Sequence, residues 1–229
     1  SNTTKLENRS PYNAKGFAYI YNQEDYENKF IKGKLNNDEL QISHKYLAPN
    51  TLIKIINPKT NESISIKNLK KVNYPDFYKI MVSKKVAEKL NLRTDLPFVE
   101  ILEIKKNKSF VAKKAKIFNE EKKISSNAPV TSVQISNISK NPKIKSKDSK
   151  DEFFILIGSF YSIDTVRFLK DRIIKELPNY NVSKLKIKKI NDKEINLISG
   201  PYKTINLMKN DYIQLKRFGF EELDINIYD

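Results

Sequence analysis

The sequence predicts an α+β protein of two domains, an N-terminal β barrel and a C-terminal ferredoxin-like domain with the element order βαββαβ. Residues 12–104 hold short, strand-like apolar runs, whereas residues 151–229 alternate between strand-like and helix-like periodicity. Residues 105–150 are rich in Lys, Ser and Asn and contain little periodic apolar content. We therefore expect an N-terminal tail at 1–11, the barrel at 12–104, a mostly disordered basic linker at 105–150 and the second domain at 151–229.

The N-terminal domain is expected to consist of short strands and one helix. Runs rich in β-branched and aromatic residues, which favour strands, lie at residues 16–21, 51–56, 63–66, 77–82 and 98–104. A helical pattern lies near residues 83–90. Short strands with a single helix are typical of a small β barrel.

The C-terminal domain shows clear changes of periodicity. Strands are expected at 153–160, 182–190, 195–199 and 223–227, and helices at 166–177 and 205–215. Pro178 ends the first helix, because proline cannot continue it, and Gly219 ends the second. The resulting order is the split βαβ layout of ferredoxin-like domains.

The composition excludes several chemistries. The chain has no Cys and one His, so a zinc site of Cys/His type, a disulfide framework and a thiol nucleophile cannot be built. Its five glycines are too scattered for a phosphate-binding loop, and we expect neither a metal nor a cofactor. No apolar run approaches the roughly 20 residues of a membrane helix. Because the chain begins with Ser, we interpret it as a mature or trimmed form whose leader has been removed.

The net charge of +16 lies mainly in the middle of the chain. Residues 104–150 carry 13 basic and 3 acidic side chains, whereas residues 151–229 carry 13 and 12. The basic segment has two interpretations, a solvated tether or a region of non-specific attraction to a polyanion. RNA-recognition domains share the βαββαβ order but need stacking aromatics and a basic surface. The C-terminal domain is nearly neutral and its third strand has no aromatic residue, so we expect no specific nucleic acid partner.

The C-terminal domain also carries two short signatures, F-F-I-L-I-G-S-F at 153–160 and L-I-S-G-P-Y at 197–202. These resemble the two signatures of the SPOR domain, the septal peptidoglycan-binding module of bacteria. The resemblance implies binding to glycan strands, preferably strands that lack stem peptides. The chain departs from the family pattern where Leu156 replaces a usual Gln, and where Asn196 and Ile198 lie on a strand that often carries Arg.

Side-chain parity indicates where a glycan would bind. Phe154 and Leu156 share a parity, as do Asn196 and Ile198, because successive side chains of a strand point to opposite faces. We place these four residues and Ser159 on or beside the glycan-facing surface that the resemblance implies. For Phe154 and Leu156, plain core packing is an equal alternative.

Four segments of the N-terminal domain follow a second family pattern. They are Gly16, Ala18 and Ile20 with their flanking tyrosines, I-S-H-K-Y-L-A-P-N-T at 42–51, I-K-I-I-N at 53–57 and I-M-V-S at 80–83. They resemble the double-psi β-barrel of the rare-lipoprotein-A (RlpA) family, lytic transglycosylases of the bacterial envelope that commonly carry a C-terminal SPOR domain. The resemblance implies cleavage of glycan strands with formation of 1,6-anhydro-muramic ends.

The catalytic residues of that family are only partly matched. A lytic transglycosylase needs a carboxylic acid to protonate the glycosidic oxygen, but Asn68 stands at the family's acid position and Met81 at that of a second aspartate. His44 matches the family histidine, and Asp76 is a candidate for a relocated acid. The alternatives are a structural role for His44 and a turn role for Asp76. We therefore expect an impaired or inactive barrel; the alternative is an active transglycosylase, a lyase, with a relocated acid.

The resemblance to the two families also implies a cellular setting. We expect a peptidoglycan-binding protein on the periplasmic side of the bacterial cell envelope, concentrated at the division septum and acting in cell wall organization. An outer-membrane lipoprotein anchor and a monomeric state are further expectations. The second alternative is an intracellular RNA-binding protein that uses the βαββαβ sheet and the basic linker.

Overall fold

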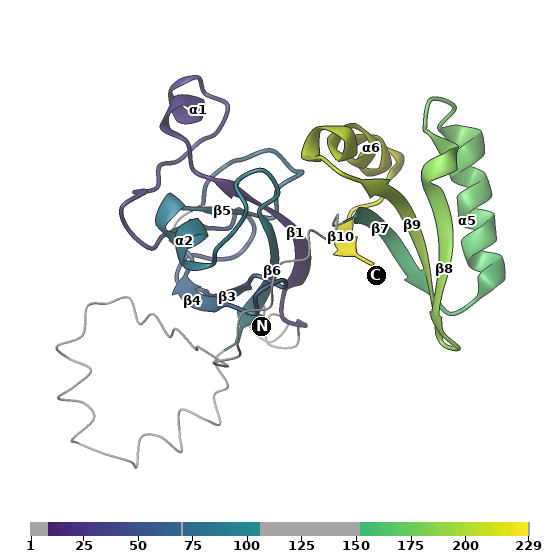
Figure 1. Cartoon of the computed structure of the whole chain (residues 1–229), viewed down its shortest axis with the longest axis horizontal. Coiled ribbons are helices and arrows are strands. Elements are labelled where there is room, and N and C mark those ends of the chain that lie inside the picture. The colour runs from purple at the N-terminus through teal and green to yellow at the C-terminus, as the bar shows by residue number, and fades with distance from the viewer. Residues whose placement is uncertain (1–8, 70, 106–151, 229) are drawn as a thin grey trace, which may run out of the picture. The chain divides into compact units, whose positions relative to one another are not determined.

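The structure, a computed structural model, describes residues 9–69, 71–105 and 152–228 (Figure 1). The predicted basic linker, apart from Lys105, and residues 1–8 of the predicted tail lie outside the described residues. The strands form two sheets, one of six strands and one of four. We call the first sheet and its helices the barrel unit (residues 13–104), and the second sheet and its helices the C-terminal unit (residues 153–228).

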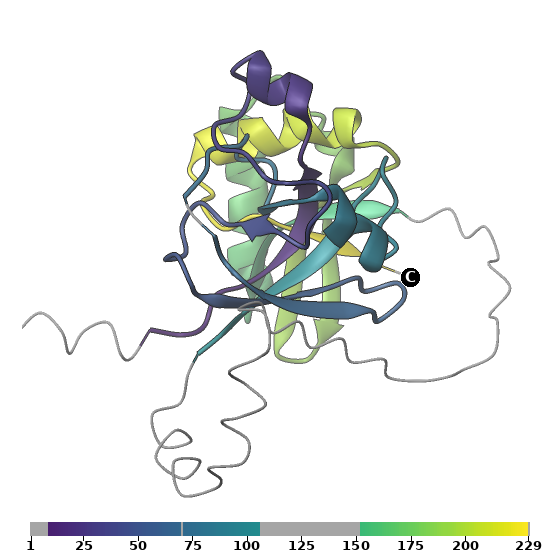
Figure 2. The same ribbon diagram turned by 90° about the vertical axis from the view of Figure 1, so that its left-hand side faces the viewer.

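The barrel unit is built on a six-stranded sheet that is nearly closed. Its elements are β1 (Asn13–Ile20), α1 (Gln23–Glu27), β2 (Ile42–Ser43), β3 (Leu52–Ile56), β4 (Ser63–Lys67), β5 (Ile80–Val82), α2 (Lys84–Lys89) and β6 (Phe98–Ile104). The strand order is β2-β5-β1-β6-β3-β4, with β1 and β5 parallel. The edge strands β2 and β4 approach each other where the backbone N–H of Leu69 donates to the carbonyl of Ile42 at 3.3 Å. Figure 2 shows the strands of this unit from a second direction.

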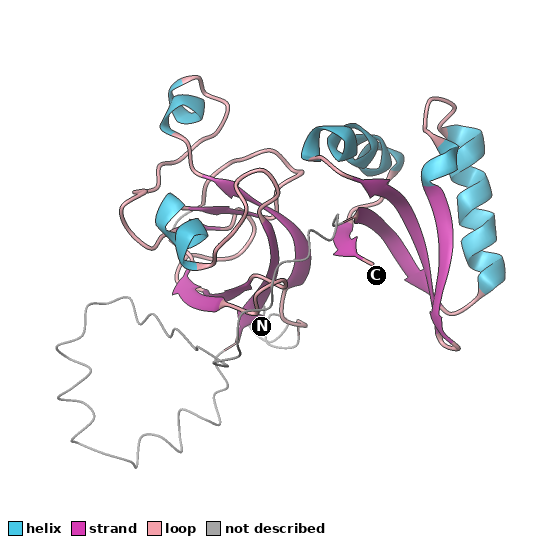
Figure 3. Cartoon of the chain, viewed as in Figure 1, coloured by secondary structure: helices cyan, strands magenta, loops and turns pink. Residues whose placement is uncertain are grey.

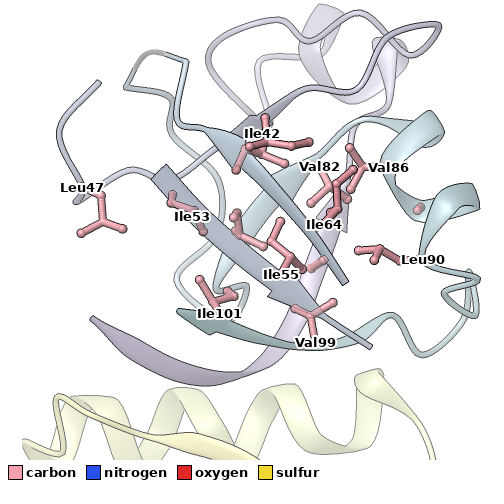
Figure 4. Close-up of a cluster of buried hydrophobic side chains, with 14 residues drawn as sticks. Ile42, Leu47, Ile53, Ile55, Ile64, Val82, Val86, Leu90, Val99 and Ile101 are labelled. Atoms are coloured by element: carbon pink, nitrogen blue, oxygen red, sulfur yellow. The ribbon is translucent and has the colours of Figure 1, made fainter. Parts of the chain in front are cut away.

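Strand alternation supplies the core of the barrel unit. On the paired strands β3 and β4, every second residue is buried, and these residues are Ile53, Ile55, Ile64 and Ile66. They belong to a cluster of buried aliphatic side chains that includes Val86 of α2 (Figure 4). Because burying an aliphatic side chain of this size contributes about 1.5–3 kcal/mol, this cluster contributes substantially to the unit's stability.

The sequence predicted the barrel unit at the level of a nearly closed sheet of short strands. Each of the five expected strands is present, but the one expected at 77–82 is limited to β5. A turn explains the difference, because the backbone N–H of Tyr78 donates to the carbonyl of Pro75 at 3.0 Å. Two elements have no periodic signal in the sequence: β2, which has only two residues, and α1, whose first turn is capped by the side chain of Asn22.

The C-terminal unit has the predicted element order. Its elements are β7 (Phe153–Phe160), α5 (Ile163–Glu176), a 3₁₀ turn (Val182–Lys184), β8 (Leu185–Asn191), β9 (Glu194–Tyr202), α6 (Ile205–Phe218) and β10 (Asp224–Ile227). The sheet is antiparallel throughout, in the order β10-β7-β9-β8. Both helices pack on one face of this sheet (Figure 3). Gly219, the expected end of the second helix, is its C-cap with φ 126°.

Buried hydroxyl groups join the sheet to the helix layer of the C-terminal unit. The hydroxyl of Tyr202 donates to the carboxylate of Asp211 on α6 at 2.5 Å and lies 2.8 Å from the Ser199 hydroxyl. The Tyr180 hydroxyl completes the chain by bonding Ser199. Burial raises the pKa of Tyr180 to about 12, so its hydroxyl keeps its proton at neutral pH. Because Ser199 faces the helices, Asn196 and Ile198, which have the opposite parity on β9, face away from them. Tyr202 reaches the helix side although its parity differs from that of Ser199, because the register between β7 and β9 shifts between these two residues.

Candidate functional site

Asn68 and His44, two of the predicted catalytic residues, meet where the edge strands of the barrel unit approach each other. The Asn68 side-chain oxygen accepts a hydrogen bond of 2.8 Å from the backbone N–H of His44. Its amide nitrogen donates to the carbonyls of His44, Leu47 and Ala48 at 3.2, 2.9 and 3.2 Å. Asn68 is completely buried. Its side chain therefore holds the turn after β2 against the end of β4, and we call this arrangement the seam.

His44 is a buried, neutral part of the same seam. Its Nδ1 accepts hydrogen bonds from the backbone N–H groups of Tyr46 and Leu47 at 3.2 and 3.1 Å, which places the ring hydrogen on Nε2. Burial, followed by the nearby charges of Lys45 and Lys79, lowers the pKa of His44 from 6.5 to about 4. Among the described residues, Nε2 is the buried side-chain polar atom without a hydrogen-bond partner. This imidazole caps a turn and is uncharged at neutral pH.

Asp76, the third predicted catalytic residue, lies on the surface beside the seam. Its carboxylate pairs with the ammonium group of Lys45 at 2.5 Å, and that ammonium also donates to the carbonyl of Tyr74 at 2.9 Å. The Lys45 ammonium lies 4.8 and 5.4 Å from the ring centroids of Tyr74 and Tyr46, within the range of cation–π attraction. Asp76 is in a turn, as the alternative interpretation expected.

The three predicted catalytic residues are therefore brought together, but in arrangements unsuited to proton donation. Asn68 uses its amide hydrogens on carbonyl groups, and His44 is buried. The Asp76 carboxylate is paired with the Lys45 ammonium group. The exposed groups at this place are the Asp76 carboxylate and the ring of Tyr46, which is 71% exposed.

The five predicted glycan-binding residues lie on one face of the C-terminal sheet, the face opposite the helices. Cross-strand pairing joins Ser159 to Asn196, and Leu156 to Ile198. Phe154 has the same parity as Leu156 on β7. Ser159 has the other parity and reaches this face only because the register between β7 and β9 shifts between Leu156 and Gly158.

Contacts between side chains connect this face, and they include Lys188 and Tyr228, which were not among the predicted site residues. Ser159 Oγ donates to Asn196 Oδ1 at 2.7 Å, and Asn196 Nδ2 donates to the hydroxyl of Tyr228 at 3.2 Å. The Tyr228 ring packs edge-on against Phe154 with centroids 5.4 Å apart, and the Lys188 ammonium lies 4.2 Å from the Tyr228 centroid. We call Phe154, Ser159, Lys188, Asn196 and Tyr228 the sheet-face cluster.

Exposure differs among the predicted glycan-binding residues. Ser159 is exposed and Leu156 is half-buried, whereas Phe154, Asn196 and Ile198 are buried, at 8%, 3% and 3% exposure. Packing therefore accounts for part of the role of Phe154, as the core-packing alternative expected. Alternation along the second strand was the available signal for Lys188, but its use required the register between β8 and β9. No local signal indicated Tyr228, which follows the last strand.

The glycines of the two signatures have packing roles. A Cβ atom on Gly200 would lie 2.6 Å from the ring of Phe154 and 2.9 Å from the carbonyl oxygen of Phe153, and its φ is 153°. A Cβ atom on Gly158 would lie 2.8 Å from the ring of Phe160. The two glycines thus let aromatic rings pack directly against the backbone of β9 and β7.

An open hollow of about 600 Å³ adjoins this cluster at the end of β7 and the turn between β8 and β9. Ser159, Phe160, Tyr161 and the turn residues 191–194 line it. Tyr161 is 87% exposed, and the turn supplies carboxylate, ammonium and amide groups. Ser159 belongs to both the hollow and the sheet-face cluster.

Comparisons with known proteins add no relative. A scan against protein-family models and a search of curated proteins found no match to this chain. Within the described ranges, no three His, Asp or Glu side chains are grouped so that they could hold a metal ion. None of the helices in the part of the chain that the structure describes has the length and apolar character required to cross a membrane.

Proposed function

We propose that this protein is an RlpA-like cell-envelope protein that binds peptidoglycan glycan strands through its C-terminal unit. In this proposal the C-terminal unit is a SPOR domain and the barrel unit is a double-psi β-barrel. The observation that supports it most is the convergence of Phe154, Leu156, Ser159, Asn196 and Ile198 on the helix-free face of one sheet. The two signatures lie on different strands, and the pairing of β7 with β9 places their residues side by side.

The chemistry of the sheet-face cluster suits a sugar polymer. Glycan strands present hydroxyl and acetamido groups at their edges and C–H groups on their ring faces. Ser159, Asn196 and Tyr228 supply hydroxyl and amide groups, and the rings of Phe154 and Tyr228 supply apolar surface. A mainly apolar surface with a few positioned polar groups is the usual composition of a small-molecule site.

The barrel unit, in this proposal, contacts glycan without cleaving it. Transglycosylation requires a proton donor at the glycosidic oxygen, and the three residues considered for that role are committed to the seam or to an ion pair. We accordingly propose a binding protein on the periplasmic side of the envelope, with a lipoprotein anchor, a septal location and a monomeric state as parts of the proposal.

Co-sedimentation of the full chain with peptidoglycan tests the binding proposal. The unmodified protein should pellet with purified sacculi, and more strongly after an amidase has removed the stem peptides. Ser159→Ala combined with Tyr228→Ala should reduce retention at least about tenfold, because both polar and stacking contacts are lost. Phe168→Ala is the matched control, since it removes an exposed ring, 65% exposed, from α5 on the opposite side of the sheet. Absence of pelleting by the unmodified chain would refute glycan binding.

A product assay tests the catalytic part of the proposal. Incubation of the unmodified chain with stem-free strands should release no 1,6-anhydro-muramic ends above a protein-free control. Robust release that disappears in Asp76→Asn would establish the alternative, an active enzyme with a relocated acid. Retention of single-stranded RNA in preference to glycan would establish the RNA-binding alternative.

A further inference from the structure

Two lysines of β8 flank the sheet-face cluster on the same face. Lys188 pairs across the strands with Asn196, and Lys186 pairs with Ile198. Since directly opposed residues of antiparallel strands project from the same side of the sheet, both ammonium groups belong to the face with Ser159 and Leu156. Cross-strand pairing thus forms two rows of residues on this face. Each row begins with a lysine on β8 and continues through a predicted glycan-binding residue on β9 and another on β7.

The charges of these two lysines are available to a ligand. Among the described residues neither Lys186 nor Lys188 pairs with a carboxylate, whereas Lys189, of opposite parity, lies 3.2 Å from the carboxylate of Asp192. Lys186 is exposed and Lys188 is half-buried. The ring of Tyr228 lies 4.2 Å from the Lys188 ammonium and restricts where it can move. A positioned cation next to polar and aromatic groups is suited to a carboxylate on a sugar.

Peptidoglycan presents such a carboxylate only in one form. The lactyl group of muramic acid is an amide when it bears a stem peptide. Hydrolysis of that amide, with water as the co-reactant, leaves the amine on the peptide and a carboxylate on the sugar. Each disaccharide of a stripped strand therefore gains one negative charge close to the sugar ring.

We propose that Lys188 and Lys186 form a subsite for the lactyl carboxylate of muramic acid, so that the C-terminal unit selects stripped strands by charge. This inference rests on the proposed glycan binding and explains how the preference for stem-free strands would arise. The attraction between a lysine and one carboxylate is modest at an exposed position. A strand repeats the carboxylate, however, so we expect a preference of about five- to tenfold for stripped over intact strands.

Three forms of the same glycan distinguish the effect of the lactyl carboxylate charge from the effect of the size of the stem peptide. The first is intact sacculi, the second is sacculi stripped by an amidase, and the third is stripped material whose lactyl carboxylates have been converted to primary amides with a carbodiimide and ammonia. The third form lacks both the stem peptide and the charge. If charge determines selection, the full chain should bind the amidated strands as weakly as intact ones, and its preference for stripped strands should decline with added salt.

Substitutions test whether the preference for stripped strands depends on Lys186 and Lys188. Lys186→Gln combined with Lys188→Gln should bind all three forms about equally, whereas Lys186→Arg combined with Lys188→Arg should keep most of the preference. Lys175→Gln, at an exposed position of α5, is the matched control and should behave as the unmodified chain. Thermal unfolding of each variant should match that of the unmodified chain, because both lysines are on the surface.

The outcomes distinguish the inference from the function on which it rests. If the unmodified chain binds none of the three forms, the proposed function fails. If it binds amidated strands as well as stripped ones, glycan binding stands but bulk rather than charge determines selection, and the inference is wrong. The inference is also overturned if single-stranded RNA displaces stripped glycan at equal phosphate and carboxylate concentrations, because the lysines would then recognise polyanions in general.

Discussion

The buried side-chain amide of Asn68 forms hydrogen bonds with several backbone groups at once. It accepts from the N–H of His44 and donates to three carbonyls of the turn that follows β2. A carboxylate has no hydrogen to donate, so an aspartate at this position would point an oxygen at three carbonyl oxygens. An amide is therefore the residue type that this seam requires. His44 has a comparable role through its Nδ1 atom, which accepts from two backbone N–H groups.

We predict that Asn68→Asp destabilises the barrel unit instead of equipping it for catalysis. Leaving buried carbonyls unsatisfied and burying a carboxylate should cost about 2–4 kcal/mol at neutral pH. Because the folded environment disfavours the charged form, the pKa of the new carboxyl should lie above its unfolded value. The deficit should then narrow as the pH falls from the raised folded-state pKa towards the unfolded value of about 4, and below that value only the cost of the lost hydrogen bonds should remain. Urea unfolding at pH 3.5 and 7 measures this, with the exposed Asn73→Asp as control. Equal stability of Asn68→Asp and unmodified protein at pH 7 would contradict it.

We also predict that His44 makes the stability of the barrel unit depend on pH. The folded-state pKa of about 4 lies below the ordinary value of 6.5, so between these values the unfolded chain binds a proton that the folded chain does not. The stabilisation should be complete above pH 6.5 and should decline by about 3 kcal/mol as the pH falls to 4. Because His44 is the only histidine, its ¹H NMR signal reports its pKa directly.

The variant His44→Asn provides the control for this pH dependence. Asparagine offers an oxygen acceptor close to the position of Nδ1 and does not titrate in this range. Its unfolding free energy should therefore change less between pH 4 and 6.5 than that of the unmodified chain. Titration of the native imidazole near pH 6.5 would contradict the prediction, because it would show that burial in the seam does not lower the pKa of His44.

At the scale of elements, the strand β9 depends on a glycine at the point where its pairing with β7 becomes irregular. The register shifts between the pairs Phe153–Tyr202 and Ile155–Ser199, with Gly200 in between on β9. At Gly200 the ring of Phe154 and a backbone carbonyl occupy the space of a Cβ atom. The signature G-P-Y is thus a packing requirement of the sheet that carries the proposed binding face.

We predict that Gly200→Ala destabilises the C-terminal unit and impairs glycan binding together. Overpacking against a carbonyl oxygen should cost about 1–3 kcal/mol, beyond a cost of about 1 kcal/mol for positive φ. Gly219→Ala separates these effects, because Gly219 also has positive φ, 126°, but no atom within 4 Å of its Cβ position. Thermal unfolding should therefore rank Gly200→Ala below Gly219→Ala. The reverse order would mean that the clash is relieved by movement of Phe154.

At the scale of the whole molecule, the net positive charge is concentrated in one region of the chain. The segment 104–150 carries 13 basic against 3 acidic side chains, which is +10 of the net +16. Peptidoglycan and nucleic acid are both anionic polymers, so under the proposed function this excess charge would add a non-specific attraction to the binding by the C-terminal unit. The two contributions differ in their response to salt.

We predict that the segment contributes to wall binding through charge. Retention of the full chain on stripped sacculi should fall between about 50 and 300 mM salt, because separated charges are screened beyond roughly 10 Å. Replacing five lysines by glutamine should flatten this dependence, and replacing them by arginine should not; the positions are 140, 143, 145, 147 and 150. Equal salt slopes for the glutamine and arginine variants would leave the segment with the role of a tether.

The sequence predicted elements that depend on neighbouring residues, but it did not predict contacts between residues far apart in the chain. Runs of apolar residues located β3, β4, β6 and β7, because alternation and helical spacing are properties of neighbouring residues. The sequence did not predict β2, because two residues are too few to show a periodic pattern of apolar residues. This strand depends on its pairing with β5. Local periodicity also could not indicate that Asn68 and His44, 24 positions apart, bond to each other.

The sequence by itself determined the element order of the C-terminal unit, the presence of a small barrel, the place of the charge, and the residue types at the candidate sites. Only the tertiary structure decided what those residues do. The register shift brings Ser159 to the face of Leu156, and Tyr228 joins Phe154 to Asn196. The physical reason is that strand register and burial follow from long-range pairing, whereas a residue's type and its neighbours in the chain determine only its local conformation. A histidine and an asparagine that suggest catalysis in the sequence are, in the tertiary structure, buried and hydrogen-bonded where the edge strands of the nearly closed sheet approach each other.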